Sequence, residues 1–289
     1  MIKSDIIVSI CCTTYNHVNY IEDCIESIIN QKTNFAFEIC IGEDESDDGT
    51  REICIDYKKK YPKIINLFLR NRSDVLFISG QPTGRSNFIN TLKQCKGKYI
   101  AICEGDDYWT DLHKLQKQVD FLEKNPDYVL IGSKADVLID KKIHKSNQPN
   151  TSKVVEKKDL LYENPFAALT TMFRNIKITF PDFYKKYYSG DVMLFCFLSD
   201  YGSLMYDNYV TGVYRVHDKG ISKRVKPLNR IISKIKMNID LNNYFNNVIS
   251  EDVRKINANY ALISLKNHYK SFTFLDGIFL IKTYFRGML

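Results

Sequence analysis

The sequence lacks several features that would place it in special classes of protein. No uninterrupted apolar stretch approaches the ~18–20 residues of a membrane-spanning helix. Residues 1–5 lead directly into a strand-like pattern, so we expect no secretory signal peptide. Its eight cysteines include no C-x-x-C pair and lie mostly in apolar segments, which argues against a disulfide scaffold or a zinc module. We expect buried thiols in a reducing, cytoplasmic compartment.

What is present is an ordinary globular composition with an uneven charge distribution. The 289 residues are 44% hydrophobic and 26% charged, enough for one large α/β domain or a domain with a small appendage. Residues 223–289 hold twelve Lys and Arg against four Asp and Glu, a net charge of +8, whereas the whole chain carries +7. A nearly neutral body thus precedes a basic tail that suits an anionic partner.

Strand and helix patterns alternate over the first 135 residues. Continuous apolar runs at 6–12, 37–42, 64–69 and 98–103 predict buried strands, and 20–31, 50–61, 87–95 and 112–122 have helical spacing. This order predicts βαβ units and a mostly parallel sheet flanked by helices. We interpret polar residues 140–165 as a mobile loop, 202–206 and 209–216 as two strands, and the segment from 227 as helical. The predicted domains are 1–222 and a basic helical extension, 223–289.

Polar clusters follow three of the predicted strands. They are Thr13-Thr14-Tyr15-Asn16, the acidic run 43–50, and Glu104-Gly105-Asp106-Asp107-Tyr108-Trp109. In a parallel sheet the carboxyl ends of strands meet at the ligand-binding edge, so we expect these clusters to converge. Crowded carboxylates need a positive neighbour, and hard oxygen ligands favour Mg²⁺ or Mn²⁺. We expect no competing set of His or Cys ligands.

These three motifs, in this order, resemble glycosyltransferase family 2. The resemblance covers about 110 residues, continues more loosely to Tyr214-Arg215-Val216-His217, and does not cover the basic tail. It implies a GT-A (Rossmann-like) fold and inverting, nucleotide-sugar-dependent transfer of a sugar with Mn²⁺ or Mg²⁺. UDP is the favoured nucleotide.

The resemblance also implies roles for particular residues. Asp44 would accept a hydrogen bond from the donor's base, Thr13 would line the base pocket, and Tyr15 would contact the nucleotide sugar. Asp106 would bind the metal, with Glu104 nearer the ribose or the metal's water shell. Here Glu-Gly-Asp stands where the family has Asp-x-Asp.

Further residues would serve the diphosphate and the proton transfer. Arg85, in the turn after Gly84, would contact phosphate. The segment with Arg215 and His217 would close over the diphosphate and metal, with Arg215 binding the nucleotide sugar and His217 binding the metal. Asp191 would be the general base. It lies at a helix start where the family has a Glu-Asp pair, but Gly190 replaces the Glu. Asp182 and Asp200 are the alternatives to Asp191.

Simpler interpretations remain for several residues. Helix capping is favoured for Asp47, Asp48 and Asp107, and Trp109 and Tyr108 would pack or stack on a sugar. His17, His113, His144 and His268 receive no functional role. The tail is either a helical cap with a solvated cationic face or a peripheral attachment to an anionic membrane, where apolar residues and Lys270, Lys282 and Arg286 would form an interfacial helix.

The sequence therefore predicts transfer of a sugar from a UDP-sugar or related donor to a hydroxyl of a glycan or lipid-linked glycan. The protein would be cytoplasmic, with the tail on the inner face of the membrane, and would bind no nucleic acid. Two alternatives are a sugar nucleotidyltransferase, which usually has a glycine-rich loop that 13–16 lacks, and a non-catalytic relative that binds nucleotide or glycan.

Overall fold

The computed structural model describes residues 5–218, 220–247, 249–268 and 273–287. The chain divides into two compact units. The first comprises Met1–Val155, Pro165–Ile178 and Leu198–His217, and the second Glu156–Asn164, Thr179–Phe197 and Asp218–Leu289. Among the described residues, no helix combines the length and apolar character that a membrane crossing requires.

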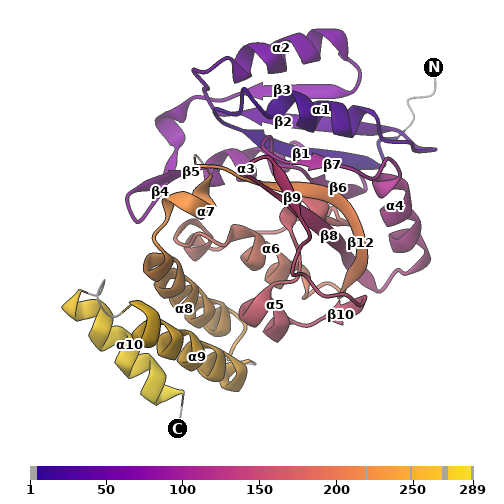
Figure 1. The fold of residues 1–289 in the computed structure, drawn as a ribbon. Coiled ribbons are helices and arrows are strands. Elements are labelled where there is room, and N and C mark those ends of the chain that lie inside the picture. The colour runs from indigo at the N-terminus through magenta and orange to yellow at the C-terminus, as the bar shows by residue number, and fades with distance from the viewer. Residues whose placement is uncertain (1–4, 219, 248, 269–272, 288–289) are drawn as a thin grey trace. The chain divides into compact units, whose positions relative to one another are not determined.

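The first unit is built on a ten-stranded sheet whose core follows the order β10-β12-β8-β11-β6-β1-β2-β3 (Figure 1). Its strands are β1 (Val8–Thr14), β2 (Phe37–Glu43), β3 (Ile65–Leu69), β6 (Tyr99–Ile102), β7 (Tyr108–Trp109), β8 (Tyr128–Ile139), β9 (Lys142–His144), β10 (Lys153–Val155), β11 (Met172–Arg174) and β12 (Ser203–Val216). A separate hairpin joins β4 (Leu76–Ile78) to β5 (Gln81–Thr83). The predicted α/β class is confirmed, although the strands after β6 pair in both directions.

Helices cover both faces of the parallel part of the sheet. They are α1 (Ile21–Ile29), α2 (Thr50–Lys60), α3 (Arg85–Leu92) and α4 (Lys114–Lys124). Ile39 and Ile41 of β2 join the buried cluster that includes residues of α1 and α2. The alternate residue Gly42 faces α3, where an added Cβ would lie 2.0 Å from Thr91 Oγ1. Because side chains alternate across a strand, α3 packs on the face opposite α1 and α2.

The predictions for residues 140–165 and for the strands at 202–206 and 209–216 were wrong. Residues 140–165 are not a loop but contain β9, β10 and α5 (Lys157–Glu163). The segments predicted as strands at 202–206 and 209–216 are one strand, β12 (Ser203–Val216), because the register shifts between Asp207 and Val210 without ending the pairing with β8. A bulge of this kind breaks the alternation of side chains while leaving the ladder intact.

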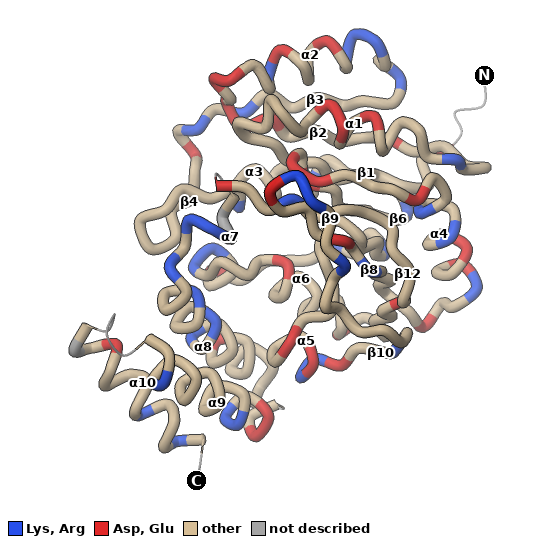
Figure 2. The backbone as a smooth tube through the Cα atoms, in the orientation of Figure 1, with Lys and Arg blue, Asp and Glu red and all other residues tan. Residues whose placement is uncertain are grey.

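The second unit is helical. Besides α5 it contains α6 (Gly190–Leu198, all but its last residue), α7 (Ile221–Arg224), α8 (Pro227–Tyr244), α9 (Ser250–His268) and α10 (Phe274–Arg286). Leu228, Ile235, Ala261 and Leu280 form its buried cluster. Lys and Arg recur along α7 to α10 (Figure 2), as the basic composition of the tail requires. The helical pattern predicted from residue 227 onward is observed in α8, α9 and α10. The division into domains at 1–222 and 223–289 stays a prediction.

Candidate functional site

Four strands end at the same edge of the sheet and bring their polar residues together. β1 pairs in parallel with β2 and β6. β12 runs in the same direction, because β11 is antiparallel to both β6 and β8 while β12 is parallel to β8. The backbone N–H of Asp44 donates to the carbonyl oxygen of Thr14 (3.1 Å), and that of Gly105 to Thr13 (2.9 Å). The expected convergence of the three polar clusters is confirmed.

On one side of this edge, Asp44, Arg72 and Tyr15 form a compact group. Arg72 Nη1 donates to Asp44 Oδ2 at 2.8 Å, and the Arg72 guanidinium carbon lies 3.7 Å from the centre of the Tyr15 ring. Burial raises the pKa of Asp44 above its ordinary value, although the charge of Arg72 acts in the opposite direction. The group offers an aromatic ring, a cation and a carboxylate acceptor within one small region.

Arg72 was missed by the sequence analysis. It begins the short helical turn Arg72–Asp74 that follows β3, at the same edge of the sheet as the three clusters. The sequence could have indicated Arg72, because residues 64–69 were predicted to be a strand and Arg72 follows its end, where a parallel sheet places its binding residues.

On the other side of Thr14, Asp106 lies between two histidines. His217 Nε2 is 3.0 Å from Asp106 Oδ2, and His17 Nε2 is 3.8 Å from the same oxygen. The three ligand atoms all lie within 4.8 Å of one another, and each residue is partly accessible. The expectation that no histidine set would gather here was wrong: the turn after β1 brings His17 to the residue that follows β12.

Arg215 is buried and forms hydrogen bonds with the turn that contains Asp106 and Asp107. Its Nη1 donates to the carbonyl oxygen of Asp106 (3.0 Å), its backbone N–H donates to Asp107 Oδ1 (2.8 Å), and Nη2 is ion-paired with Asp23. The guanidinium also lies 4.4 Å from the centre of the Tyr108 ring. With the residue only 8% exposed, these contacts point to a role in positioning the acidic turn.

The two adjacent carboxyl groups of this turn have opposite electrostatic environments. Burial alone would raise the pKa of Asp106, but its hydrogen bond with His217 and its electrostatic interactions with His17 and His217 lower it below its ordinary value. Burial, with the charges of Asp106 and Glu104, raises the pKa of Asp107 well above its ordinary value. Asp106 is therefore the carboxylate suited to a cation, and Asp107 is the one that supports the backbone.

The other predicted residues occupy varied positions. Thr13 and Glu104 are half-buried at the strand ends. Arg85 was predicted to lie in a turn, but it is the first residue of α3 and is 8% exposed. Asp191 lies in the second unit, in the first turn of α6, where its charge raises the pKa of Lys234 while the larger effect of burial lowers it.

Trp109 closes the acidic turn as a packing residue. It is 4% exposed, and its Nε1 donates to the carbonyl oxygen of Leu169 at 2.7 Å. The ammonium of Lys114, itself fully buried, lies 4.2 Å from the ring centre and donates to Gln118 Oε1 at 2.8 Å. Of the two interpretations of Trp109, the structure supports packing rather than stacking on a sugar.

The donor set at Asp106 fits a divalent cation. One carboxylate oxygen and two imidazole nitrogens are common ligands of Mn²⁺ and other first-row transition metals. Two atoms bound in adjacent positions at about 2.1 Å lie about 3.0 Å apart, which is the observed separation between His217 and Asp106. The residues present therefore match the metal dependence that the sequence led us to expect.

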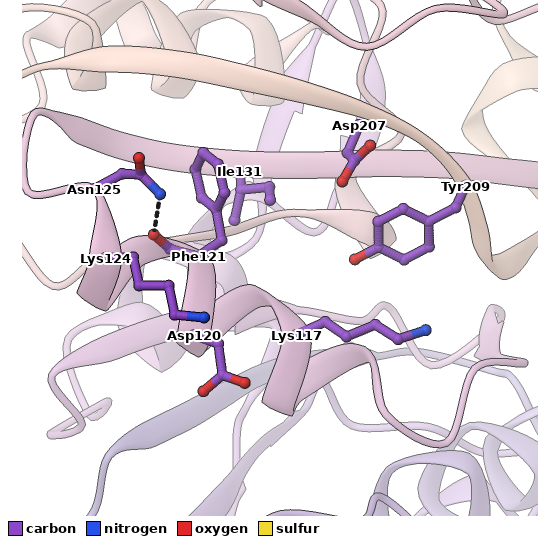
Figure 3. Close-up of a pocket in the computed structure, with 8 residues that line it drawn as sticks. All are labelled: Lys117, Asp120, Phe121, Lys124, Asn125, Ile131, Asp207 and Tyr209. Atoms are coloured by element: carbon purple, nitrogen blue, oxygen red, sulfur yellow. Dashed lines mark hydrogen bonds between the residues drawn. The ribbon is translucent and has the colours of Figure 1, made fainter.

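A separate open pocket of about 390 Å³ lies over α4, β8 and β12 (Figure 3). Its lining residues are Lys117, Asp120, Phe121, Lys124, Asn125, Ile131, Asp207 and Tyr209. None of the predicted site residues is among them.

Comparison with known proteins identifies the family of this chain. Residues 9–184 match the family model described as glycosyl transferase family 2. Over 119 residues, 41% of this chain, the sequence is 36% identical to the uncharacterized protein Rv1520 of Mycobacterium tuberculosis, and this match spans 32% of that protein. The chain thus spans about a third of the length of this curated relative.

Two solved structures show a similar fold. TarS 1–349 of S. aureus in complex with UDP superposes with a TM-score of 0.62 at 17% identity, covering 92% of this chain and 74% of TarS 1–349. The mannosyltransferase PcManGT of Pyrobaculum calidifontis, in complex with GDP-Man and Mn²⁺, superposes with a TM-score of 0.57 at 13% identity, covering 99% and 82% of the two chains. Because the family model spans more than half of the sequence and ends beyond all three strand-end motifs, this chain belongs to glycosyl transferase family 2.

Proposed function

We propose that this protein transfers a sugar from a nucleotide diphosphate donor, with UDP-sugars favoured, to a hydroxyl of a glycan or lipid-linked glycan, with inversion. The observation that carries the proposal is the edge of the sheet where Asp44 and Arg72 lie near the Asp106–His217 pair. Family membership and the nucleotide complexes of TarS and PcManGT support a nucleotide-sugar donor.

The donor's base would bind at the group formed by Asp44, Arg72 and Tyr15. Uracil presents an imide N–H, for which the Asp44 carboxylate is an acceptor. Tyr15, with 36% of its surface exposed, offers a ring face next to the Arg72 guanidinium. The adjacent Thr13 would line the same pocket, and Arg85 would contact phosphate.

Asp106 and His217 would hold a divalent cation, Mn²⁺ or Mg²⁺, that offsets negative charge on the departing diphosphate. Arg215 keeps the turn of Asp106 in place, and Glu104 would lie nearer the ribose. Asp191 would accept the proton of the acceptor hydroxyl. The acceptor oxygen then bonds to the anomeric carbon as the bond from that carbon to the diphosphate breaks, and one such displacement inverts the configuration.

A panel of nucleotide sugars with Mn²⁺ or Mg²⁺ tests the proposal by measuring release of nucleoside diphosphate. Asp106→Ala should abolish metal-dependent UDP binding. Asp191→Asn should abolish turnover yet keep UDP affinity within a few-fold, and Asp182→Asn is the matched control. Loss of turnover in Asp182→Asn but not in Asp191→Asn would identify Asp182 as the general base. Nucleoside triphosphate formed from pyrophosphate would indicate a nucleotidyltransferase, and binding without turnover a non-catalytic relative.

The tail is proposed to attach the protein to an anionic membrane surface. Leu275, Ile281 and Phe285 on α10 are 75%, 47% and 60% exposed, close to the exposed basic residues Lys282 and Arg286. Lys270, which the sequence analysis included, lies outside the described residues. Such a mixture suits an interfacial helix.

Replacing the three exposed apolar residues of α10 with Ser should reduce sedimentation with anionic vesicles. The control, Phe77→Ser, removes a side chain 63% exposed in the first unit and should leave sedimentation unchanged. Undiminished sedimentation of the triple variant would contradict attachment through α10.

A further inference from the structure

His17 lies in the turn between β1 and α1 and faces the Asp106–His217 pair. Its Nε2 atom is 3.8 Å from Asp106 Oδ2, and its ring centre is 5.9 Å from that of His217, nearly perpendicular to it. Three different parts of the chain therefore present ligand atoms to one point: the turn after β1, the acidic turn after β6, and the end of β12.

The backbone of His17 is fixed by its surroundings. Its N–H donates to Thr50 Oγ1 at 2.8 Å, and its carbonyl oxygen accepts from the N–H groups of Tyr20 (2.8 Å) and Ile21 (2.9 Å). The neighbouring N–H of Val18 donates to Asp48 Oδ2 at 3.2 Å. The first turn of α1 and the beginning of α2 thus hold this turn against the sheet edge.

The ring itself has a partner that sets its orientation. Nδ1 lies 3.2 Å from Thr14 Oγ1. When Nδ1–H donates to this hydroxyl oxygen, Nε2 carries the lone pair and points it toward Asp106. A metal-binding histidine usually has an acceptor on its other ring nitrogen, and Thr14 can serve as that acceptor.

Gly105 provides the space for this arrangement. A Cβ at position 105 would lie 2.6 Å from Thr14 Oγ1 and 3.1 Å from His17 Nδ1. The small middle residue of Glu-Gly-Asp is therefore what allows Thr14 and His17 to pack against the acidic turn.

The distance between His17 and Asp106 suits a shared ion better than a direct contact. A hydrogen bond between nitrogen and oxygen spans about 2.7–3.2 Å, so 3.8 Å is too long for one. Two atoms bound to the same ion at about 2.1 Å lie between about 3.0 Å and about 4.2 Å apart, according to the angle between the bonds. The separation of 3.8 Å falls within that interval.

We propose that His17 is a third protein ligand of the metal, which makes the site a two-histidine, one-carboxylate centre that selects Mn²⁺ and related transition metals over Mg²⁺. The inference rests on the proposed function, since it concerns the metal of the same site. Its physical reason is that imidazole nitrogen binds transition metals well, whereas Mg²⁺ favours carboxylate, carbonyl and water oxygens.

The test is direct measurement of metal binding to the full chain in the presence of UDP. Pulsed electron paramagnetic resonance of bound Mn²⁺ should detect two coupled imidazole nitrogens, and one in His17→Gln. Titration calorimetry of the same variant should show Mn²⁺ affinity reduced by about tenfold or more and Mg²⁺ affinity changed much less. The control His144→Gln changes an exposed histidine on β9 and should keep both nitrogens and both affinities.

A second variant separates ligation from a loss of folding. Thr14→Val keeps the imidazole but removes its hydrogen-bond partner, and should weaken Mn²⁺ binding by up to about tenfold while the second nitrogen coupling remains. Circular dichroism spectra should be unchanged in all variants.

Other results would overturn the inference in distinguishable ways. A single coupled nitrogen in the wild type, lost in His217→Gln and kept in His17→Gln, would refute the role of His17 and leave the proposed function standing. Absence of divalent metal binding in the wild type, with UDP present, would refute both.

Discussion

Lys114 offers a sharp test of the packing behind the acidic turn. Its side chain is fully buried against Trp109, and burial lowers the pKa of Lys114 from the ordinary 10.5 to about 7. Replacing it with Met, which has similar length, removes a buried charge but also takes the donor away from Gln118 Oε1, so the two effects oppose each other. What distinguishes them is pH, because only the effect of the charge changes with the protonation of Lys114.

The size and sign of the effect follow from proton linkage. Between pH 7 and about pH 10 the folded protein has lost the Lys114 proton while the unfolded chain keeps it, so the free energy of unfolding contributed by this group rises with pH. Each pKa unit is equivalent to about 1.4 kcal/mol, so the stability of Lys114→Met relative to the wild type should fall by about 4 kcal/mol from pH 7 to pH 10. Below about pH 6 both the folded and the unfolded wild type hold the proton, and the difference should be constant.

Urea unfolding of both proteins across this range measures the difference. The absolute curves are less informative, because buried thiols such as Cys54, whose pKa burial raises, ionise more readily in the unfolded chain and oppose the trend. That contribution is common to both proteins and cancels in the difference. Lys117→Met, at a half-exposed position in the same helix, should show no such slope. Parallel stability curves for the wild type and Lys114→Met would refute the assigned pKa of Lys114.

Two further predictions concern the site and the sheet beneath it. Asp44→Ala should weaken UDP binding by about 10–100-fold in calorimetry, because a hydrogen bond to a charged group contributes about 1.5–3 kcal/mol. Asp56→Asn on α2 is the control. Unchanged affinity in Asp44→Ala would show that uracil does not bind at Asp44. Gly42→Ala should destabilise the folded protein by a few kcal/mol in thermal unfolding, because its Cβ would lie 2.0 Å from Thr91 Oγ1. In the control Gly84→Ala the new Cβ meets no atom within 4 Å, and the melting temperature should be unchanged. Equal melting temperatures for the two variants would contradict the packing of α3 on β2.

The sequence was informative wherever structure depends on neighbours along the chain. Apolar runs and helical spacing located β1, β2, β3 and β6 and the helices between them to within a few residues. The strand-end rule then found Asp44 and Asp106, because parallel pairing places such residues at one edge whatever the details of packing.

Segments whose structure depends on distant partners were predicted less well. The short strands β9 and β10 have no apolar periodicity because they are largely exposed, and they are strands because β8 and β12 pair with them. Arg85 was placed in a turn for a similar reason: the preceding Gly84 marks a break in the chain but does not show that a helix begins at the next residue.

The sequence by itself determined the order of strands and helices, the family, and which carboxylates would lie at the sheet edge. Only the tertiary structure decided that His17, which sequence reasoning set aside, would face Asp106 and His217, that Arg72 would pair with Asp44, and that Arg215 would be buried. Asp106 and His217 are 111 residues apart. Their contact depends on β12 following the direction of β6 through β11 and β8, and pairings of that kind leave no local pattern in the chain.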